Sequence, residues 1–549
     1  MRGSSLVGGA ASFQLSASGR GFLNGGLRVW AVMAFLVFLP LLFSCSDERP
    51  ENGSADRETA EAGREGREAP SEATGEPAAK EDKTVAGRPD PRSALVPVAH
   101  LTSLRESVSL DELSGADELS VPSGSLGAAE ELVERPGFRS FDSPDAVVDH
   151  VSRTPGALGL LPWDEVGPRV KALAVEGESI LEPGASDLSG YPLRPEGGTG
   201  PDAGELRRVV IGGDVVLDRG QSYMVIQQGM GLDFPLDGGY AAITGRTLEP
   251  NPYDASSTVH RFTAARTGQA GAVREYLSGA DLTLANLENP VVEGAVYHPE
   301  EATFTGDPRL MPILEGAGID GVTLGNNHVL DAGVSGLEET LGYLDRAGIE
   351  RAGAGIDLAE AREPMIFDLG DTRIGVLSHL SIPGYEWAWA TETTPGTAPL
   401  VEDVLREDVE RLREEVDLVV VMPHWGLEYL AEPEPGQVDL AHAAVDAGAD
   451  LVVGGHAHWP KGIEMYEGAP VFYGVGNFLL DQSWSEETST GIFAEITIYK
   501  DRIVQTEPVP FVLLDYAQPN FLVPEAGGDR ALRKIYAASL GPEFEAYEE

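Results

Sequence analysis

The sequence predicts an α/β fold from about residue 206 onward, and three observations support this. Strand-like apolar runs alternate with helical patterns from Arg207 to Ala447, as they do in repeated strand–helix units. Two hairpin signals, Gly370-Asp371 and Glu467-Gly468, lie in the second half of this region. Polar side chains stand where several apolar runs end, which is where open α/β sheets place their ligands. Together these features predict a mixed sheet, or two stacked sheets, with helices outside.

The charge of the chain limits its partners. Among 549 residues, 89 are acidic and 39 are Lys or Arg, which gives a formal net charge of −50. Nucleic acid and anionic lipid both require basic protein surface, so neither is expected as the main partner. The acidic excess fits a solvated surface in a salty or extracytoplasmic setting, or the binding of cations. The length allows two or three domains.

The N-terminus has the features of a secretion signal. A basic residue precedes the apolar run Val29 to Phe43, which is too short to span a bilayer comfortably. Leu42, Ser44 and the single Cys45 resemble a bacterial lipobox, in which the signal peptide, here residues 1–44, is removed and the cysteine carries lipid. This predicts an extracytoplasmic lipoprotein, anchored to the membrane of the bacterial cell envelope. The alternative is an ordinary signal peptide or anchor helix with an incidental cysteine.

Residues 45–93 are predicted to be a disordered tether. They consist mainly of Glu, Arg, Ala, Gly and Pro and contain almost no large apolar side chain. Such a composition cannot bury a core, so this acidic, proline-rich linker would hold the folded part away from the membrane.

Residues 94–195 are predicted to form a small α/β domain. The pattern resembles part of the second lobe of periplasmic solute-binding proteins, in which a Pro-Gly-Ala-Leu-Gly strand precedes a Val-Lys-Ala-Leu strand. Only one lobe is present, so solute capture and an accessory domain without a ligand are both open. Residues 184–205 are expected to be a linker. The expected elements are strands at Leu95–Val98, Pro155–Pro162 and Val170–Val175 and a helix at Pro144–Ser152.

Residues 206–515 are predicted to form the main domain, followed by a peripheral C-terminal tail, residues 516–549. The expected strands are Arg208–Gly212, Leu282–Ala285, Gly321–Leu324, Met365–Leu369, Arg373–Ser378, Asp417–Met422, Asp450–Val453, Ile463–Tyr466, Val471–Tyr473, Ile492–Tyr499 and Ile503–Pro508. The expected helices are Ala272–Ser278, Pro308–Gly316, Val334–Ala347, Leu405–Glu415 and Gln437–Ala447.

The stretch Val322 to Gly333 gives the first indication of a site. An apolar strand breaks at Gly325, and two amides, an imidazole and a carboxylate follow between Asn326 and Asp331. These groups are costly to bury without partners. They therefore require either a hydrogen-bond network or a metal.

Similar residues follow other strands, and such strand ends meet at one edge of an open α/β sheet. Carboxylates, imidazoles and an amide oxygen form a ligand set for one or two divalent ions such as Mn, Fe or Zn. The segment His456-Ala-His458 is expected to be extended, with both imidazoles on one face. Each motif alone is explained by a turn or a core pair, but the ordered set predicts a shared metal site. Its candidate residues are Asp214, Asn286, Glu288, Asn327, His328, His424, His456 and His458.

Residues that flank these ligands are assigned supporting roles. One group is expected to contact an anionic polymer or a phosphoester substrate: Arg219, Asn286, Trp425, Tyr429 and Lys461. A second group is expected to stand behind the ligands and orient them or brace their loops: Asp331, Glu428, Glu464, Asn477 and Asp481. Glu428 and Glu464 are equally explained as surface charge, and Asp331 is expected to cap the helix that follows it.

Six ordered motifs resemble those of the poly-γ-glutamate capsule-synthesis (CapA-like) family, a branch of the calcineurin-like metallophosphoesterase superfamily. The matching segments are Gly213–Arg219, Asn286–Pro290, Gly325–Gly333, His424–Tyr429, Gly455–His458 with Glu464, and Gly476–Phe478 with Asp481 and Gln482. The resemblance covers about residues 206–515 and implies a four-layer αββα sandwich with the site at the strand ends. It implies that Asp214, Glu288, Asn327, His424, His456 and His458 are the metal ligands. It also implies catalytic roles for Asp214, Asn327 and His328, the last as the group that protonates a leaving group or binds phosphate.

Two residues depart from the superfamily pattern. Val216 stands where a histidine ligand is usual, and Glu288 stands where an aspartate usually bridges two metals. One or two ions are therefore both compatible with the sequence, and phosphatase activity is left open.

The resemblance implies a metal-dependent hydrolase or transferase in capsule or poly-γ-glutamate biosynthesis or export, with a membrane-bound polymer synthase as partner. The alternative is a non-catalytic, lipid-tethered binding or scaffold protein on the same fold. Poly-γ-glutamate is anionic, so the acidic surface opposes its binding unless cations bridge the two.

Overall fold

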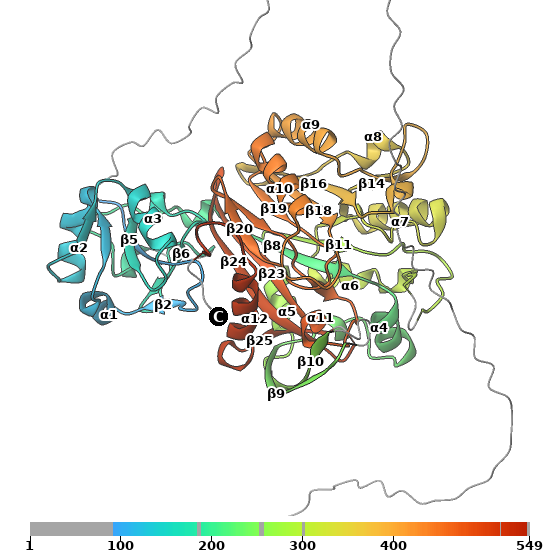
Figure 1. The fold of residues 1–549 in the computed structure, drawn as a ribbon, viewed down its shortest axis with the longest axis horizontal. Coiled ribbons are helices and arrows are strands. Elements are labelled where there is room, and N and C mark those ends of the chain that lie inside the picture. The colour runs from blue at the N-terminus through green and yellow to red at the C-terminus, as the bar shows by residue number, and fades with distance from the viewer. Residues whose placement is uncertain (1–91, 184–187, 252–256, 299–301, 517, 546–549) are drawn as a thin grey trace, which may run out of the picture. The chain divides into compact units, whose positions relative to one another are not determined.

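The computed structural model describes most of the chain beyond residue 91, and Figure 1 shows its elements. The described residues are 92–183, 188–251, 257–298, 302–516 and 518–545. The predicted signal peptide, Cys45 and nearly all of the predicted tether lie outside these ranges. Among the described helices, none combines the length and apolar character needed to cross a bilayer.

A small α/β domain follows the predicted tether, built on a five-stranded sheet in the order β4-β3-β5-β1-β6. Its helix α3 begins where the sequence predicts, because Pro144 occupies the first turn and the Ser143 side chain accepts a bond from the Ala146 N–H. The expected strand 170–175 is instead two short strands, β6 and β7, and β7 pairs with β2. The bounds are β1 Leu95–Ala99, β2 Ser107–Val108, β3 Ser120–Pro122, β4 Arg139–Phe141, β5 Leu158–Pro162, β6 Lys171–Ala172, β7 Ala174–Val175, α1 Leu110–Gly115, α2 Leu126–Val133 and α3 Pro144–Ser152.

The predicted linker 184–205 is in part a packed segment of this small domain. Tyr191 is buried and its hydroxyl donates to the Leu95 carbonyl at 2.9 Å, and Leu193 is fully buried. The Ala94 N–H donates to the Thr199 carbonyl at 2.8 Å. The linker prediction is therefore wrong for these residues, because isolated apolar side chains in a Gly- and Pro-rich stretch complete the core beside β1.

Two larger sheets form the main domain. A sheet of ten strands has the order β10-β9-β25-β24-β23-β8-β11-β12-β13, with β22 paired to β8, and a sheet of six has the order β15-β16-β18-β19-β21-β20. The ten strands are β8 Leu206–Val215, β9 Tyr240–Pro250, β10 Thr258–Gly268, β11 Leu282–Leu287, β12 Gly321–Thr323, β13 Glu350–Ala352, β22 Asn477–Leu479, β23 Thr490–Tyr499, β24 Arg502–Leu514 and β25 Gln518–Leu522. The six strands are β15 Met365–Leu369, β16 Thr372–Ser381, β18 Leu418–Trp425, β19 Leu451–Val453, β20 Ile463–Tyr466 and β21 Ala469–Phe472.

Apolar packing arranges these sheets and their helices in four layers. Ile211 on β8 and Val420 on β18 belong to one core in which the two sheets face each other. Leu341 packs helix α7, with α5 and α6, on the outer face of the ten-stranded sheet. Leu412 and Ala444 pack helices α9 and α10 on the outer face of the six-stranded sheet. This order confirms the predicted αββα sandwich.

The helices of the main domain are mostly short. They are α4 Arg219–Ser222, α5 Ala272–Ser278, α6 Pro312–Ala317, α7 Gly333–Ala347, α8 Leu358–Ala361, α9 Glu402–Arg413, α10 Pro435–Ala447, α11 Glu486–Ser489 and α12 Gly528–Ala537. A small pair, β14 Ala354–Gly355 and β17 Gly396–Thr397, lies outside the two large sheets.

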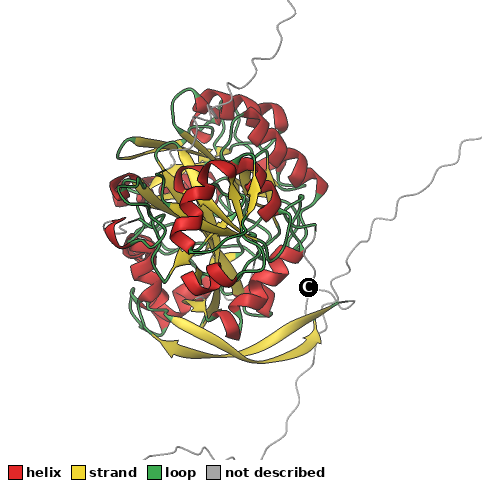
Figure 2. Cartoon of the chain, turned by 90° about the vertical axis from the view of Figure 1, so that its left-hand side faces the viewer, coloured by secondary structure: helices red, strands yellow, loops and turns green. Residues whose placement is uncertain are grey.

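The C-terminal segment is not peripheral, so that prediction is wrong. Strand β25 pairs with both β24 and β9, and all five of its residues are buried. It contains Pro519 and Asn520, which are poor strand formers and conceal the strand in the sequence. The long β9–β10 hairpin, which no sequence signal predicts, extends from the same side of the sheet (Figure 2).

Candidate metal centre

The predicted ligands lie at the carboxyl ends of strands in both large sheets. Parallel pairing aligns the ends of β8, β11 and β12 in one sheet and of β16, β18 and β19 in the other. Strand ends in such sheets face one crevice. The structure brings to this place Asp214 on β8, Glu288 after β11, Asn327 after β12, His424 on β18, and His456 and His458 after β19.

The ligand atoms form two overlapping sets. In each set, one atom from each residue lies within 4.8 Å of the others. Asn327 joins the first set, because its Oδ1 lies 2.9 Å from His424 Nε2. The first set is Glu288, His424 and His456, and the second is Asp214, Glu288 and His458. Glu288 belongs to both sets, so it occupies the position of a bridging carboxylate.

The burial of these groups fits a bound cation. Asp214 and Glu288 are fully buried, yet Asp214 Oδ2, both Glu288 carboxylate oxygens and His456 Nδ1 have no hydrogen-bond partner among the described residues. Glu288 Oε1 is 3.3 Å from His424 Nε2 and Asp214 Oδ2 is 3.3 Å from His458 Nδ1, but neither contact has hydrogen-bond geometry. Buried carboxylates without partners are costly, and a divalent ion would satisfy them. Mixed carboxylate, imidazole and amide donors suit a divalent metal ion.

The His456-Ala-His458 segment differs from its prediction. His456 has φ = 82° and His458 has φ = 56°, so the segment is left-handed rather than extended. The two imidazoles consequently serve different ligand sets instead of sharing one face. Arg219 and Tyr429, beside the same site, also have positive φ. Non-glycine residues held in this region are strained, and such strain concentrates at functional sites.

Close packing of strands β8 and β22 positions the predicted ligands Asp214 and His458. A Cβ on Gly213 would lie 1.8 Å from the Gly476 carbonyl oxygen, so only glycine lets β22 approach β8. This approach places Asn477 opposite Asp214. Asn477 Oδ1 is 2.8 Å from His458 Nδ1. Asn477 therefore lies where it can orient His458.

His328 lies beside the ligand sets and is held by Asp331. The distance between His328 Nδ1 and Asp331 Oδ2 is 2.8 Å, and the same oxygen accepts the Phe304 N–H at 2.8 Å. Phe304 packs its ring against the imidazole at 4.5 Å. Helix α7 begins without a side-chain cap. The prediction that Asp331 caps this helix is therefore wrong, and its carboxylate orients His328 instead.

Three residues predicted to contact substrate are enclosed instead. Asn286 donates to Asp214 Oδ1 at 2.8 Å and stands behind that carboxylate. Trp425 is buried and its indole N–H donates to the Tyr473 carbonyl. Lys461 is fully buried and its Nζ donates to the Leu430 carbonyl at 3.1 Å, and burial lowers its pKa to about 8. The residues next to these three in the sequence do not indicate that their polar groups are buried.

The other flanking residues divide into two groups. Glu464 contacts His442 and Tyr473 rather than any predicted ligand, so its assignment as an orienting carboxylate of the site is wrong. Tyr429 places its ring 6.0 Å from the His458 ring, and Glu428 is exposed. Their roles at the cleft stay predictions.

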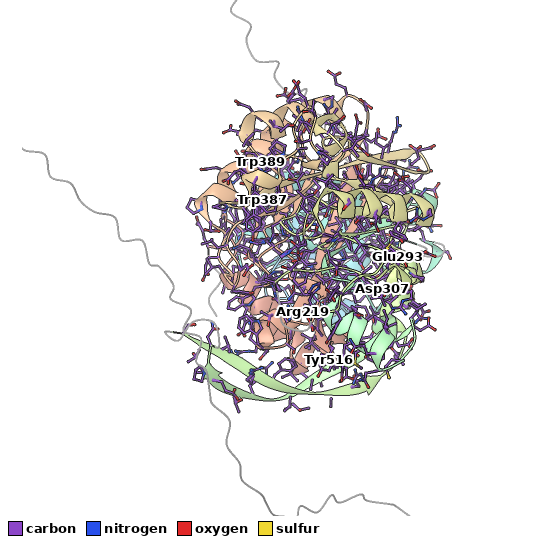
Figure 3. The ribbon with its side chains drawn as sticks, turned by 90° about the vertical axis from the view of Figure 1, so that its right-hand side faces the viewer. Arg219, Glu293, Asp307, Trp387, Trp389 and Tyr516 are labelled. Atoms are coloured by element: carbon purple, nitrogen blue, oxygen red, sulfur yellow. The ribbon has the colours of Figure 1, made fainter. Side chains whose placement is uncertain are left out.

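Arg219 is the cation that remains available beside the centre. Its Nε lies 2.8 Å from Asp481 Oδ1, and about a fifth of its side chain is exposed. Figure 3 shows it on the same face as Tyr516 and Asp307. Its contact with an anionic substrate stays a prediction.

Two residues of the site have roles that sequence reasoning missed. Asn326 donates to the Asn286 side chain and to the Leu287 carbonyl, and its Oδ1 accepts the His328 N–H. Its position beside Asn327 in a polar strand end was the available signal. Phe304 lies in a loop without any motif, so nothing in the sequence indicates its contact with His328.

Charges within the metal-free centre are unevenly distributed. Burial alone would lower the pKa of His458, but Glu288 and Asp214 outweigh it and raise that pKa to about 9. Burial, followed by the neighbouring histidines, holds the pKa of His456 well below its ordinary value. Burial would raise the pKa of Asp214, yet contact with His458 lowers it. His456 is thus neutral at pH 7, whereas His458 carries a proton that a metal would have to displace.

These shifts predict that the metal-free protein is most stable near pH 6.5. The raised pKa of His458 contributes stability below about pH 6.5 that is lost as the pH rises through about 9. The lowered pKa of His456 removes stability as the pH falls below about 6.5. His458 alone would make this alkaline limb about 3 kcal/mol, and above about pH 8 the lowered pKa of Lys461 offsets part of it. Denaturant unfolding from pH 5 to 9.5 measures it, and His458→Gln should flatten that limb; an unchanged limb contradicts the assignment.

Comparison with known proteins gives consistent matches over the main domain. A sequence profile described as bacterial capsule synthesis protein PGA_cap matches residues 208–482. The PGA biosynthesis protein CapA of Bacillus subtilis (strain 168) is 31% identical over 241 residues, covering 42% of this chain and 63% of that protein. The capsule biosynthesis protein CapA of Bacillus anthracis is 30% identical over 230 residues, covering 40% of this chain and 55% of that protein. The chain therefore spans less than two thirds of either relative.

A solved structure of a phosphatase from Mycoplasma pneumoniae also matches. It is 15% identical, with a TM-score of 0.32, and the match covers 56% of this chain and 94% of that chain.

Proposed function

The chain belongs to the bacterial capsule synthesis protein PGA_cap family, and on that premise we propose that it is a metal-dependent accessory protein of capsule or poly-γ-glutamate biosynthesis. Its reaction would be a hydrolytic or transfer step on a phosphoester or amide bond. The observation that carries the proposal is the pair of buried ligand sets that share Glu288, whose carboxylate oxygens have no hydrogen-bond partner among the described residues.

The residues present define how such a centre would be held. Glu288, Asn327, His424 and His456 would hold one divalent ion, and Asp214, Glu288 and His458 would hold a second. When bound, divalent ions lower the pKa of water and stabilise negative charge on a reacting oxygen.

His328 would supply the proton for the leaving group. Its Nδ1 is engaged by Asp331, so Nε2 is the nitrogen available to a substrate. A positioned imidazole of this kind acts as a general acid. The packing of Phe304 against the ring restricts its rotation. Arg219, which lies beside the site, would receive the anionic part of the substrate.

Metal content and turnover test this function together. We expect the purified full chain to contain Mn, Fe or Zn, and to hydrolyse a generic phosphodiester or a γ-glutamyl amide in a manner that a chelator abolishes and added metal restores. Protein that lacks both bound metal and turnover after metal addition would instead be a binding or scaffold protein, which contradicts the proposal.

Replacing Val216 by histidine should strengthen the second metal position. Val216 is 1% exposed and packs with Phe304 and Leu480, two residues after Asp214 on the same strand end. A histidine there adds a ligand to a set that has only three. After dialysis, Val216→His should retain a number of metal ions per chain closer to two than the wild type does. Overpacking by the larger side chain should lower the free energy of unfolding by about 1–3 kcal/mol. Val216→Leu is the control for packing, and an equal metal ratio in both variants contradicts the prediction.

We also propose that the protein is anchored to the cell envelope through Cys45 and acts beside a membrane-bound polymer synthase. The lipobox-like sequence around Cys45 supports the anchor. Metabolic labelling with a fatty acid should mark the wild type and not Cys45→Ala, and that variant should leave the membrane fraction. Labelling of both proteins would contradict a lipid at this cysteine.

A further inference from the structure

A surface cavity of about 580 Å³ lies between strand β9 and the first part of helix α12. Four cationic side chains line it, from Arg246, Arg530, Arg533 and Lys534, together with the acidic Glu525 and Asp529. The chain as a whole carries 89 acidic and 39 basic residues. Four cations around one cavity are therefore unusual for this protein.

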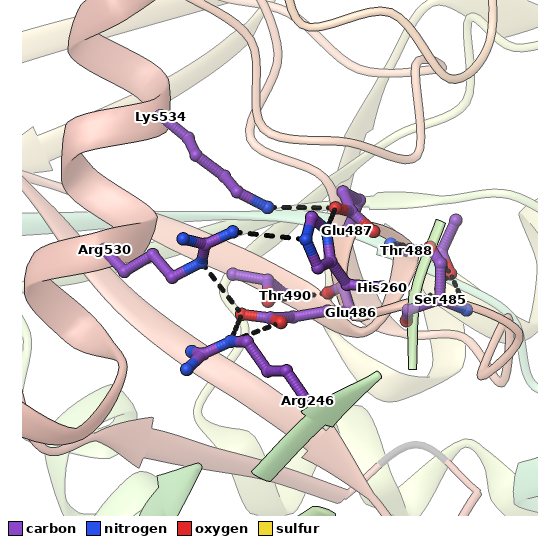
Figure 4. Close-up of polar contacts among 9 residues, drawn as sticks. All are labelled: Arg246, His260, Ser485, Glu486, Glu487, Thr488, Thr490, Arg530 and Lys534. Atoms are coloured by element: carbon purple, nitrogen blue, oxygen red, sulfur yellow. Dashed lines mark hydrogen bonds and ion pairs between the residues drawn. The ribbon is translucent and has the colours of Figure 1, made fainter. Parts of the chain in front are cut away.

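The buried Glu486 and the partly buried Glu487 contact three of these cations. Arg246 Nε contacts both oxygens of Glu486 at 2.7 and 3.0 Å, and Arg530 approaches the same carboxylate at 3.9 Å (Figure 4). Lys534 Nζ contacts Glu487 at 2.9 Å, as does His260 Nδ1. The glutamate side chains are only 6% and 15% exposed, whereas those of Arg246, Arg530 and Lys534 are 27–43% exposed. The solvent side of this cluster therefore presents mainly cations.

Arg246 and Arg533 have N–H donors that are not bonded to any described residue. An arginine offers five N–H donors. Within the described parts of the chain, Arg246 bonds Glu486 through Nε alone. Arg533 is exposed and has no hydrogen bond or ion pair with any described residue. Planar guanidinium groups with free donors bind carboxylates in a bidentate manner.

The cavity is connected to the candidate metal centre through helix α11. Both glutamates belong to α11, and its Thr488 carbonyl accepts a bond from Asn477 Nδ2 at 2.9 Å. Asn477 Oδ1 in turn contacts His458 Nδ1 at 2.8 Å. The same short helix thus fixes the cation cluster on one side and the residue that orients a predicted ligand on the other.

We propose that this cavity is a docking site for the carboxylates of an acidic polymer of the γ-linked glutamate type, separate from the metal centre. The identity of the polymer rests on the proposed function, whereas anion binding rests on the cation cluster. Successive carboxylates of one polymer molecule would contact successive guanidinium groups. These contacts act at short range, so they can hold the polymer although the net negative charge of the protein repels it at long range. The polymer would be retained here while another part of it reaches the metal centre.

Polymer binding to the metal-free full chain tests the proposal, because chelation removes any contribution from the metal centre. We expect labelled poly-γ-glutamate to bind the wild type with an affinity that falls as salt rises. The double variant Arg530→Gln with Arg533→Gln should bind about tenfold more weakly. The matched control, Arg373→Gln with Arg406→Gln, makes the same charge change at two partly exposed arginines elsewhere and should change the affinity less than about twofold.

Several outcomes would overturn this assignment. Equal weakening in the two double variants would show that only net charge matters. Absence of binding to the wild type, or equally tight binding of an uncharged γ-linked glutamine polymer or of polyphosphate, would exclude a site for polymeric carboxylates. Arg533→Gln alone removes a side chain without described partners, so it keeps the test valid if the double variant is unstable, and it should weaken binding in the same direction. Loss of hydrolysis in other variants does not bear on this measurement, since no turnover is involved.

Discussion

Glu288→Gln should stabilise the metal-free protein and at the same time abolish most of its metal-dependent behaviour. Glu288 is fully buried and neither of its carboxylate oxygens has a hydrogen-bond partner among the described residues. Above about pH 9, where His458 has lost the proton that Glu288 stabilises, removing this buried charge should raise the free energy of unfolding of the metal-free protein by about 1–3 kcal/mol. Because Glu288 belongs to both ligand sets, turnover should fall on the order of 10³-fold.

Thermal unfolding with and without metal separates these two effects. Added metal should raise the melting temperature of the wild type and leave that of Glu288→Gln nearly unchanged. Glu293→Gln, an exposed glutamate on the loop that follows, is the matched control and should behave as the wild type. A variant that is less stable without metal, or that still gains stability on adding metal, would show that Glu288 is not a shared ligand.

His328→Ala should lower turnover by about 10²–10⁴-fold while leaving the metal content unchanged. His328 lies beside the ligand sets but belongs to neither, and Asp331 holds its Nδ1 at 2.8 Å. Its removal therefore takes away a proton donor without removing a ligand. The effect should be largest for substrates with poor leaving groups, because these depend most on protonation.

Asp331→Asn distinguishes orientation from simple packing. Loss of the carboxylate should reduce turnover less than loss of the imidazole, because the imidazole stays in place but loses the contact that orients it. For the His328→Ala variant, the control is His150→Ala, which removes a partly exposed histidine in the small domain. Equal turnover in wild type and His328→Ala, with metal bound, would exclude His328 as the general acid.

Much of the main domain could be predicted because local patterns and the tertiary fold agree there. Helix α5 begins and ends at the predicted residues, as helix α3 does in the small domain, and the strand ends that carry Asp214, Glu288, Asn327 and His424 converge. Buried strands bounded by glycine and followed by polar groups leave few other arrangements in a parallel sheet.

The remaining features depend on distant contacts that no local pattern contains. The backbone at His456 and His458 has positive φ, although a His-x-His sequence is equally compatible with an extended segment. Lys461 and Trp425 carry polar atoms that suggest a cleft, yet carbonyl groups of Leu430 and Tyr473 satisfy those atoms inside the protein. Only the structure reveals such partners.

Strand β8 has a consequence for the order in which the protein matures. It pairs with β11, with β22 and, through Ile211 opposite Ala494, with β23. The strand that carries Asp214 is thus completed by chain synthesised far later, and such long-range pairing is slow to form. In an emerging polypeptide, strand β8 therefore lacks one of its neighbours until residues 490–499 have left the ribosome. If the chain is exported, as proposed above, this delay would favour an incompletely folded, translocation-competent state during most of its synthesis.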